Sequence, residues 1–215
     1  MVAKGPASAD SARTRILDSA ERIFVQKGFV GSSLRAITSA AGVNLAAAHY
    51  YFGSKQGLFK AVFCRCLAPI NEQRLLALDT LLRENPKPDL RDILAAFLRP
   101  VMLHSNQDTL DLMAQMTAEP EELTNPILAE QFGELVTRYT AGLQLVFPKM
   151  REQELNVKLT FVIGAMLQTI FNRSFFINVD EVSKEEKCQQ LLNFSVAGFL
   201  NNDQPGIPKE VELHD

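Results

Sequence analysis

The sequence predicts an all-α protein, in which a small N-terminal unit of three helices precedes a larger helical body. Apolar residues recur every three or four positions along most of the chain, which is the period of an amphipathic helix. No segment sustains an alternation of apolar and polar residues, and no hairpin dipeptide joins two such segments. Residues 33–60 add a specific pattern, because they parse as a helix, a glycine turn, a short helix and the start of another.

The first expected helix precedes that pattern. It is expected to stop at the Lys27-Gly28-Phe29 segment, because glycine readily ends a helix. Its apolar stripe consists of Ile16, Leu17, Ala20, Ile23 and Phe24.

The second expected helix begins after Ser33, whose hydroxyl makes it a good N-cap. Leu34, Ile37 and Ala41 then form one narrow apolar stripe at helical spacing. Gly42 supplies the positive φ that turns the chain sharply without a Cβ clash. The pattern therefore predicts a short helix and a tight turn.

The third expected helix is capped by Asn44 and directs Ala48 and Phe52, one turn apart, towards the core. The rest of its surface offers methyl groups, an imidazole and a phenol, with no acidic residue, and this suits the major groove of DNA. These surface residues are Leu45, Ala46, Ala47, His49 and Tyr50.

A fourth helix is expected directly afterwards. Gly53 ends the third helix, Ser54 caps the fourth, and Lys55 lies in its first turn. Free amides at a helix N-terminus, together with a lysine, form a ready phosphate site. A packed helical hairpin with no role in DNA binding is the alternative interpretation.

The run from Ser33 to Lys60, with the amphipathic helix before it, resembles the DNA-binding domain of the TetR family of one-component regulators. The resemblance implies a homodimeric repressor that binds a pseudo-palindromic operator and is released by a small effector. The residues that it assigns to DNA binding are Ser33, Arg35, Asn44, Leu45, Ala46, Ala47, His49, Tyr50 and Lys55.

The resemblance also implies which of these residues contact phosphates and which contact bases. Ser33, Tyr50 and Lys55 would mainly hold phosphates, whereas residues 45–47 would touch base edges or thymine methyl groups. His49 suits either role. Since Asn44 is the one residue of this helix with a bidentate amide, we expect recognition to depend on apolar contacts and on DNA shape.

Within the family, the segment Gly-Val-Asn-Leu-Ala-Ala-Ala-His-Tyr-Tyr-Phe-Gly-Ser-Lys is similar to a subgroup that includes regulators of fatty-acid degradation. That subgroup responds to long-chain fatty acids or acyl thioesters. It usually has Asn and His near the end of the helix, whereas this chain has His49 and Tyr50. The similarity covers roughly the first seventy residues, so it bears on the operator more than on the ligand.

The distribution of charge agrees with a nucleic-acid partner at the N-terminal end. The net charge is −3, but residues 1–60 hold eight Lys and Arg against three acids, for a net +5. The rest of the chain carries −8. The basic end is thus the end with the helix-turn-helix pattern.

Several common classes are disfavoured. The three cysteines, Cys64, Cys66 and Cys188, come without a secretory signal, so we expect a reducing cytoplasm and packing roles. The longest apolar run, residues 161–167, is too short for a membrane span. Because no phosphate loop, paired-His zinc motif or nucleophile elbow is present, we expect no enzyme, metal or cofactor.

The body is expected to contain five or more helices. The fourth helix should continue to Leu82, with a kink at Pro69, until Asn85-Pro86-Lys87-Pro88 breaks it. Asp89 caps the next helix. Further helices are expected over 109–118, from Thr124-Asn125-Pro126 to Pro148, and over 152–176 and 183–200. We therefore divide the chain into a DNA-binding domain (1–60), an effector-binding and dimerisation domain (61–205) and a polar tail (206–215).

The last two helices are expected to pair with those of a second subunit, as the resemblance implies. They carry more apolar surface than one inward stripe needs. Ile163 and Met166 are expected in this interface; a monomer with a thick core is the alternative. The residues in question are Leu159, Val162, Ile163, Met166, Ile170, Phe171, Leu191, Leu192, Phe194, Ala197 and Leu200.

An apolar effector with one polar end is expected inside the larger domain. Methionine and phenylalanine side chains suit an adaptable apolar cavity, and polar residues of the eighth helix would orient the ligand if they face inward. The expected ligand residues are Met102, His104, Met113, Met116, Phe132, Gln168, Asn172 and Arg173. An acyl-binding protein or enzyme, and a protein-interaction adaptor, are the alternative functions.

Overall fold

The computed structural model describes residues 7–116, 118–171 and 181–201 of the chain. Within these residues it contains nine α-helices and no strand. The helices are α1 (Ala7–Lys27), α2 (Leu34–Ala40), α3 (Leu45–Phe52), α4 (Lys55–Glu84), α5 (Leu90–His104), α6 (Gln107–Met116), α7 (Glu121–Val146), α8 (Glu152–Phe171) and α9 (Lys184–Leu200). The all-α prediction is confirmed.

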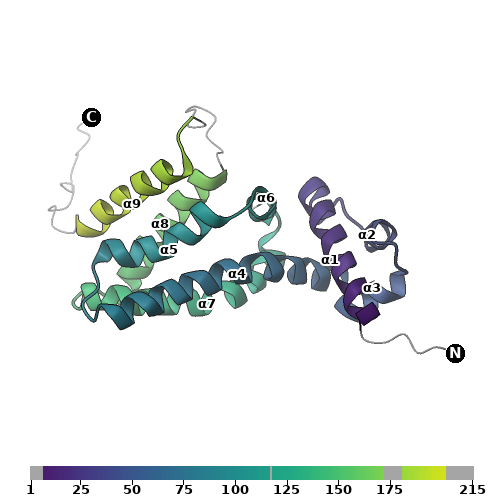
Figure 1. Ribbon diagram of the computed structural model, residues 1–215, viewed down its shortest axis with the longest axis horizontal. Helices are drawn as coiled ribbons and strands as arrows, with labels where there is room; N and C mark the ends of the chain where they lie inside the picture. Colours follow the sequence, from purple (N-terminus) through teal and green to yellow (C-terminus); the bar gives the residue numbers. More distant parts are fainter. Residues whose placement is uncertain (1–6, 117, 172–180, 202–215) are drawn as a thin grey trace, which may run out of the picture.

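Two helical units share one long helix. Helices α1, α2 and α3 form a small unit at one end, and α4 runs out of it along the length of the larger body (Figure 1). Helix α7 lies along α4, and α5 packs against both of them. Helix α8 packs against α7, α9 packs against α5 and α8, and α6 lies where the two units meet. The expected boundary between residues 60 and 61 therefore falls inside a continuous helix.

Helix ends in the small unit follow the sequence signals closely. The side chains of Ser33, Asn44 and Ser54 each accept a hydrogen bond from a backbone N–H three residues further on, at 3.2, 2.8 and 3.1 Å. Gly42 and Gly53 have φ of +62° and +71°, so each turn uses a conformation that suits glycine. The predicted helix, turn and helix are confirmed.

Aromatic rings hold the small unit to the first turns of α4. The Phe24 and Phe29 rings each meet the ring of Phe59 edge-on, with centroids 5.1 Å apart in both pairs. The ring of Phe63 continues this cluster, with its centroid 4.6 Å from that of Phe59. Ala48, which is the buried residue of α3, fixes that helix against the same core. The exposed face of α3 is therefore set by its packing against α1, α2 and α4.

One helix start was wrongly predicted. Helix α7 begins at Glu121, whereas Thr124 had been expected at the start, and the Thr124 hydroxyl donates to the carbonyl of Pro120 at 3.3 Å. Two glutamates in the first turn favour the earlier start, because negative charge stabilises a helix N-terminus. Pro126 lies inside the helix. Residues 172–176, which were also expected to be helical, lie outside the described residues.

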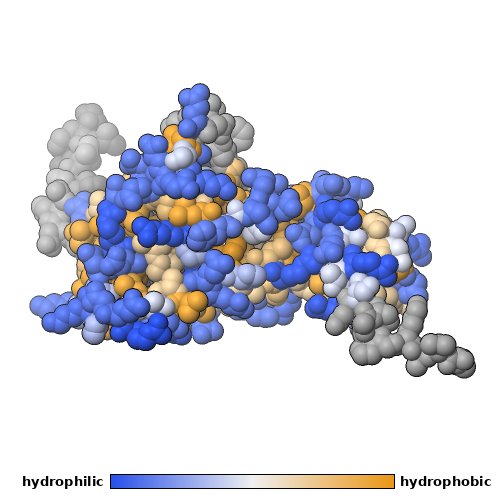
Figure 2. All heavy atoms as spheres, viewed as in Figure 1, coloured by the Kyte–Doolittle hydropathy of each residue, from blue (hydrophilic) through white to orange (hydrophobic). Residues whose placement is uncertain are grey.

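The larger unit exposes apolar side chains on α8 and α9. Phe161 is 71% and Phe194 72% exposed in the single chain, whereas Met166 is buried inside it and Ile163 is half-buried. Met166 was therefore wrongly expected in a subunit interface. Figure 2 shows a mostly hydrophilic surface, with hydrophobic residues emerging in the part built by α5, α8 and α9.

Helix α8 is also long and apolar enough to cross a membrane by length and composition alone. The sequence had indicated that no apolar run reaches that length, because α8 intersperses polar residues among apolar ones. The core helix of a globular protein satisfies the same test, so this property alone does not decide what covers α8.

Candidate nucleic-acid interface

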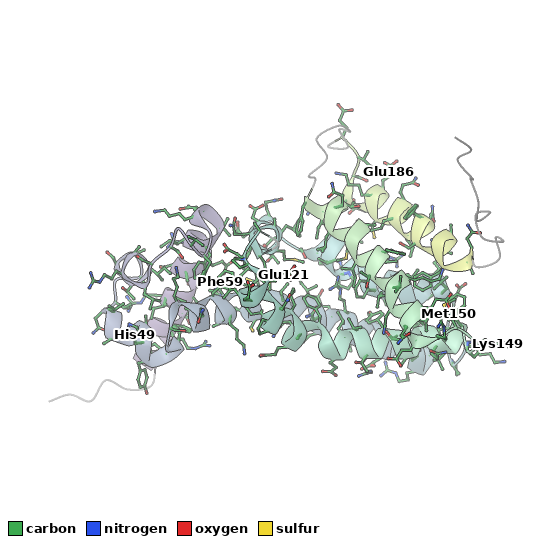
Figure 3. All side chains as sticks on the ribbon, turned by 180° about the vertical axis from the view of Figure 1, so that it is seen from behind. His49, Phe59, Glu121, Lys149, Met150 and Glu186 are labelled. Atoms are coloured by element: carbon green, nitrogen blue, oxygen red, sulfur yellow. The ribbon has the colours of Figure 1, made fainter. Side chains whose placement is uncertain are left out.

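The exposed face of α3 is formed by Ala46, His49 and Tyr50, which are spaced three and four residues apart. Tyr50 is 83% exposed, and its ring rests edge-on against that of Tyr51. Leu45 and Ala47 are half-buried at the margins of the same face. His49 lies at the outer end of the small unit, far from the large one (Figure 3).

The polar residues expected to contact DNA are partly used by the fold. The oxygens of Ser33 and Asn44 accept the capping hydrogen bonds, which leaves a hydroxyl hydrogen and an amide NH₂ as the outward donors. Both residues are exposed. Donors are the groups that phosphate oxygens require, so the capping geometry is compatible with phosphate contacts.

His49 is oriented by the end of its own helix. Its Nδ1 lies 3.0 Å from the carbonyl oxygen of Gly53. Because a carbonyl only accepts, Nδ1 carries the proton in this contact and Nε2 is the remaining nitrogen. A neutral imidazole would then present an acceptor, which can pair with a base amino group.

The segment of the chain that contains α2 and α3 carries no acidic residue. The sequence contains no Asp or Glu between Glu21 and Glu72, while it contains Arg35, which is exposed in the first turn of α2. Lys27 is exposed at the end of α1. A surface with cations and without carboxylates attracts a polyanion such as the DNA backbone.

Lys55 is held by the loop between α1 and α2. Its ammonium donates to the carbonyls of Phe29 at 2.8 Å and Ser32 at 3.0 Å, and it lies 4.1 Å from the centroid of the Phe29 ring. Two of its three N–H groups are thus engaged within the protein. One N–H is left for the phosphate contact that the sequence suggested.

The Phe29 backbone is bound from the opposite side by the larger unit. Its N–H donates to Oε1 of Glu119, between α6 and α7, at 2.6 Å. Phe29, Lys55 and Glu119 together are called the Phe29 clamp below. A Cβ on neighbouring Gly28 would lie 2.7 Å from Nε2 of Gln115, so the two units are in close contact here, and the φ of +67° at Gly28 favours glycine.

Sequence reasoning did not single out Glu119. Its role depends on a contact between residues 90 positions apart, and no local pattern announces such a contact. The clamp links the segment before α2 to the loop before α7. It is therefore a direct connection between the two units.

The residues expected to bind an effector differ in their exposure. Met102, Met113 and Met116 are buried in the core, Phe132 is half-buried, and His104 and Gln168 are exposed. Gln168 therefore does not face inward in the single chain. Asn172 and Arg173 lie outside the described residues.

A cavity of about 330 Å³ lies between α1, α4, α5 and α6. Of the expected ligand residues, His104 alone is among its lining residues. Cys66 also lines it, and burial raises the pKa of this thiol to about 12, so it stays protonated at neutral pH. In the described part of the chain, no group of His, Cys, Asp and Glu residues is arranged to hold a metal ion.

Comparison with known proteins identifies both units. Residues 16–62 match the family described as bacterial regulatory proteins, tetR family. Residues 95–198 match the tetracyclin repressor-like, C-terminal domain.

Curated relatives of the chain are transcriptional regulators. The chain is 35% identical over 88 residues to the HTH-type transcriptional repressor NicS of Pseudomonas putida, covering 40% of each protein. It is 21% identical over 186 residues to the HTH-type transcriptional regulator YerO of Bacillus subtilis, covering 80% of this chain and 60% of that protein. Over 200 residues it is 25% identical to the repressor BepR of Brucella suis, covering 90% of this chain and 81% of that protein.

Among solved structures, the fold is similar to that of NalD, the secondary repressor of the MexAB-OprM multidrug efflux pump in Pseudomonas aeruginosa. The TM-score is 0.65 and the identity 21%, with 89% of this chain and 97% of that chain covered. A TetR-family structure from Mesorhizobium loti gives a TM-score of 0.63 at 19% identity, with 89% and 96% covered. These likenesses are at the level of the fold.

Proposed function

The chain belongs to the TetR family of transcriptional regulators, and from this premise we propose that it is a DNA-binding repressor released by a small effector. The observation that supports this proposal best is the exposed, acid-free face of α3, which carries Ala46, His49 and Tyr50 at the end of the small unit. Such a face fits the major groove, and cations on the neighbouring helix favour the phosphate backbone. Membership of a family of transcriptional regulators also argues against an enzymatic function.

The proposed contacts divide by chemistry. Ser33, Arg35, Asn44, Tyr50 and Lys55 hold phosphates through donor groups, and residues 45–47 meet base edges or thymine methyl groups. His49 presents Nε2 to either. Phosphate contacts carry no base information, whereas a contact to a base edge does.

The test is equilibrium binding to DNA from the chain's own upstream region, at several salt concentrations. Tyr50→Phe should weaken binding to all sequences alike, and Ala47→Ser should change the preferred base at one operator position. Lys149→Ala is the matched control, because Lys149 is an exposed lysine at the far end of the larger unit (Figure 3). If the wild type shows no preference for any operator over random DNA, the proposal fails.

The repressor is proposed to act as a homodimer through α8 and α9. Val157 and Phe161 form an exposed stripe on α8, and Phe194 and Leu200 are exposed on α9. Gly164 lies next on the α8 stripe, and a Cβ there would meet nothing within 4 Å, so a second chain has room to approach closely. A dimer places two α3 helices on successive major-groove faces, roughly 34–36 Å apart on DNA.

Phe161→Glu tests this interface, because a charge in an apolar interface costs on the order of several kcal/mol unless it is paired. Sedimentation should show a folded monomer. Leu145→Glu is the control, since Leu145 is also largely exposed, at 58%, but lies on α7. A stable dimer of the Phe161→Glu protein would exclude the proposed surface.

The effector is proposed to be a small apolar molecule, and a long-chain fatty acid or acyl thioester is the specific candidate. The proposal rests on the resemblance of the first seventy residues and on the apolar interior of the larger unit. A cytoplasmic location is part of the same proposal. Operator affinity measured with fatty acids, acyl thioesters and small aromatic compounds tests it, since an effector must bind the released form more tightly.

A further inference from the structure

Arg74 of α4 is a buried cation without a partner of opposite charge among the described residues. It is only 2% exposed. Its Nε donates to the Phe97 carbonyl at 2.8 Å, one terminal nitrogen lies 3.4 Å from Oδ1 of Asn71, and the other lies 3.3 Å from the sulfur of Met166. No carboxylate of residues 11–116, 118–171 and 181–201 forms an ion pair with it.

These contacts do not match what a guanidinium can bind. It carries five N–H groups and favours planar anions, which accept two parallel hydrogen bonds. Arg74 has one close carbonyl, one distant amide oxygen and a thioether, which is a weak acceptor. Burial lowers the pKa of Arg74 to about 10, so the group still carries its charge at neutral pH. An unmatched buried charge is unfavourable for the empty protein.

Four helices of the larger unit surround this group with apolar and aromatic side chains. Phe97 of α5 lies with its ring centroid 4.3 Å from the guanidinium carbon, and the Tyr139 ring of α7 meets Phe97 edge-on at 5.0 Å. Met166 comes from α8. The Tyr139 hydroxyl donates to the backbone carbonyl of Arg74, which fixes the helix turn that presents the side chain.

We propose that Arg74 is the anchor of the effector site, and that the effector is a monoanion with a carboxylate head and an apolar body. The carboxylate takes the place of the Met166 sulfur at the terminal nitrogen, since methionine is flexible enough to move aside. The apolar body lies among the aromatic rings and methionine side chains of α5, α7 and α8. The single positive charge of the guanidinium matches a single negative charge. No second cation is among the groups that change the pKa of Arg74.

This inference deepens the proposed function, and it rests on it only in assuming that the larger unit receives an effector. It assigns to Arg74 the anchoring role that the sequence suggested for Arg173. Because Arg74 and Lys55 lie on the same helix, an anion bound at Arg74 acts directly on the helix that positions α3.

The test is calorimetric binding to the full chain without DNA, using hexanoate, decanoate and benzoate, with 1-hexanol, 1-decanol and benzyl alcohol as neutral counterparts. We expect at least one carboxylate to bind the wild type at least tenfold more tightly than its alcohol. Arg74→Met should remove that preference. Arg83→Met, an exposed arginine on the same helix, should leave it unchanged.

Thermal unfolding of the empty protein provides a second readout. A buried charge kept for a ligand should make Arg74→Met at least as stable as the wild type, because an apolar side chain of similar size removes an unmatched charge. Arg74→Lys keeps the charge without the planar fork, and it should bind the carboxylate several-fold more weakly. It serves as the second variant if Arg74→Met does not fold.

The inference is overturned if no carboxylate is preferred over its alcohol, or if the preference survives in Arg74→Met and Arg74→Lys. A clear loss of stability in Arg74→Met without any carboxylate preference would make Arg74 a structural residue. Operator binding is measured separately, so its failure would count against the repressor and leave an anion site at Arg74 standing.

Discussion

The two halves of α4 each hold a cation against an aromatic ring and a backbone carbonyl. The two cations differ in how many of their N–H groups have a carbonyl acceptor. Lys55, at the start of the helix, is half-buried and donates to two carbonyls at 3.0 Å or less. Arg74, nineteen residues later, is buried and has one such carbonyl. Both lie over a phenylalanine ring, at 4.1 and 4.3 Å.

This difference in hydrogen bonding makes Lys55 a structural contact and Arg74 a candidate binding site. A cation whose donors are satisfied by carbonyls fixes the loop that supplies them, and Lys55 therefore fixes the segment before α2. A buried cation with donors left over is unfavourable until an acceptor arrives, and Arg74 is therefore suited to a ligand. Substitution at the two positions should have opposite effects on the stability of the empty protein.

Lys55→Met should give the largest effect. It removes two charge-assisted hydrogen bonds and takes the ammonium away from the Ser32 carbonyl, while the Phe29 carbonyl keeps the hydrogen bond from the Ser32 hydroxyl. We expect a loss of about 3 kcal/mol in the free energy of unfolding. Urea unfolding measures it. Operator affinity should fall as well, and the slope of log K against log salt should flatten by about one if the third N–H binds a phosphate.

Lys60→Met is the control for this substitution. Lys60 lies one turn and a half further along α4 and pairs with Glu130 on the surface. Its removal should leave stability unchanged within error, because exposed ion pairs contribute little. Equal losses at the two lysines would show that the clamp does not differ from a surface contact.

Cys66 lies between the two cations on α4. The raised pKa of its thiol predicts a loss of stability at alkaline pH. Burial raises the pKa of its thiol from 9.0 to about 12, so the unfolded chain releases this proton at lower pH than the folded one. Stability from this group is complete below pH 9 and is lost as pH rises from 9 towards 12.

Because the thiol is half-buried, solvent should reduce the slope to roughly 0.5–1 kcal/mol per pH unit. Urea unfolding at pH 8 and pH 10 measures the change, and Cys66→Ala should show a smaller decrease than the wild type. The same decrease in both proteins would assign the pH dependence to other groups.

Glu119→Gln should give the smallest effect on stability. The amide keeps an oxygen for the Phe29 N–H and loses only the charge, so we expect a loss of about 1 kcal/mol or less. Operator affinity should change more than unfolding, because the clamp sets how the two units meet. Glu122→Gln, exposed in the first turn of α7, is the matched control, and equal effects on operator affinity would exclude the clamp.

The sequence predicts the small unit well because its signals are local. Ser33, Asn44 and Ser54 cap their helices where the sequence indicates, and glycine stands at each turn. Ala48 faces the core, as its spacing requires. Each of these features depends on residues within one or two turns of each other.

The larger unit is predicted in outline but not in its contacts. Helix α8 is apolar on several sides, so periodicity could not tell that Met166 faces inward and Phe161 outward. Arg74 gave no signal, because a single arginine in a helix is usually exposed. Its burial follows only from the packing of four helices, which residue spacing does not encode.

The continuity of α4 gives this protein mechanical leverage. A helix rises about 1.5 Å per residue, so Lys55 and Arg74 are separated by about 28 Å along one continuous helix, which contains Pro69. A tilt of one degree about the Arg74 end moves the other end by roughly 0.5 Å, by the same geometry. A rotation of about five degrees would therefore displace α3 by roughly 2.5 Å, enough to mismatch a pair of grooves whose separation is set by the pitch of DNA.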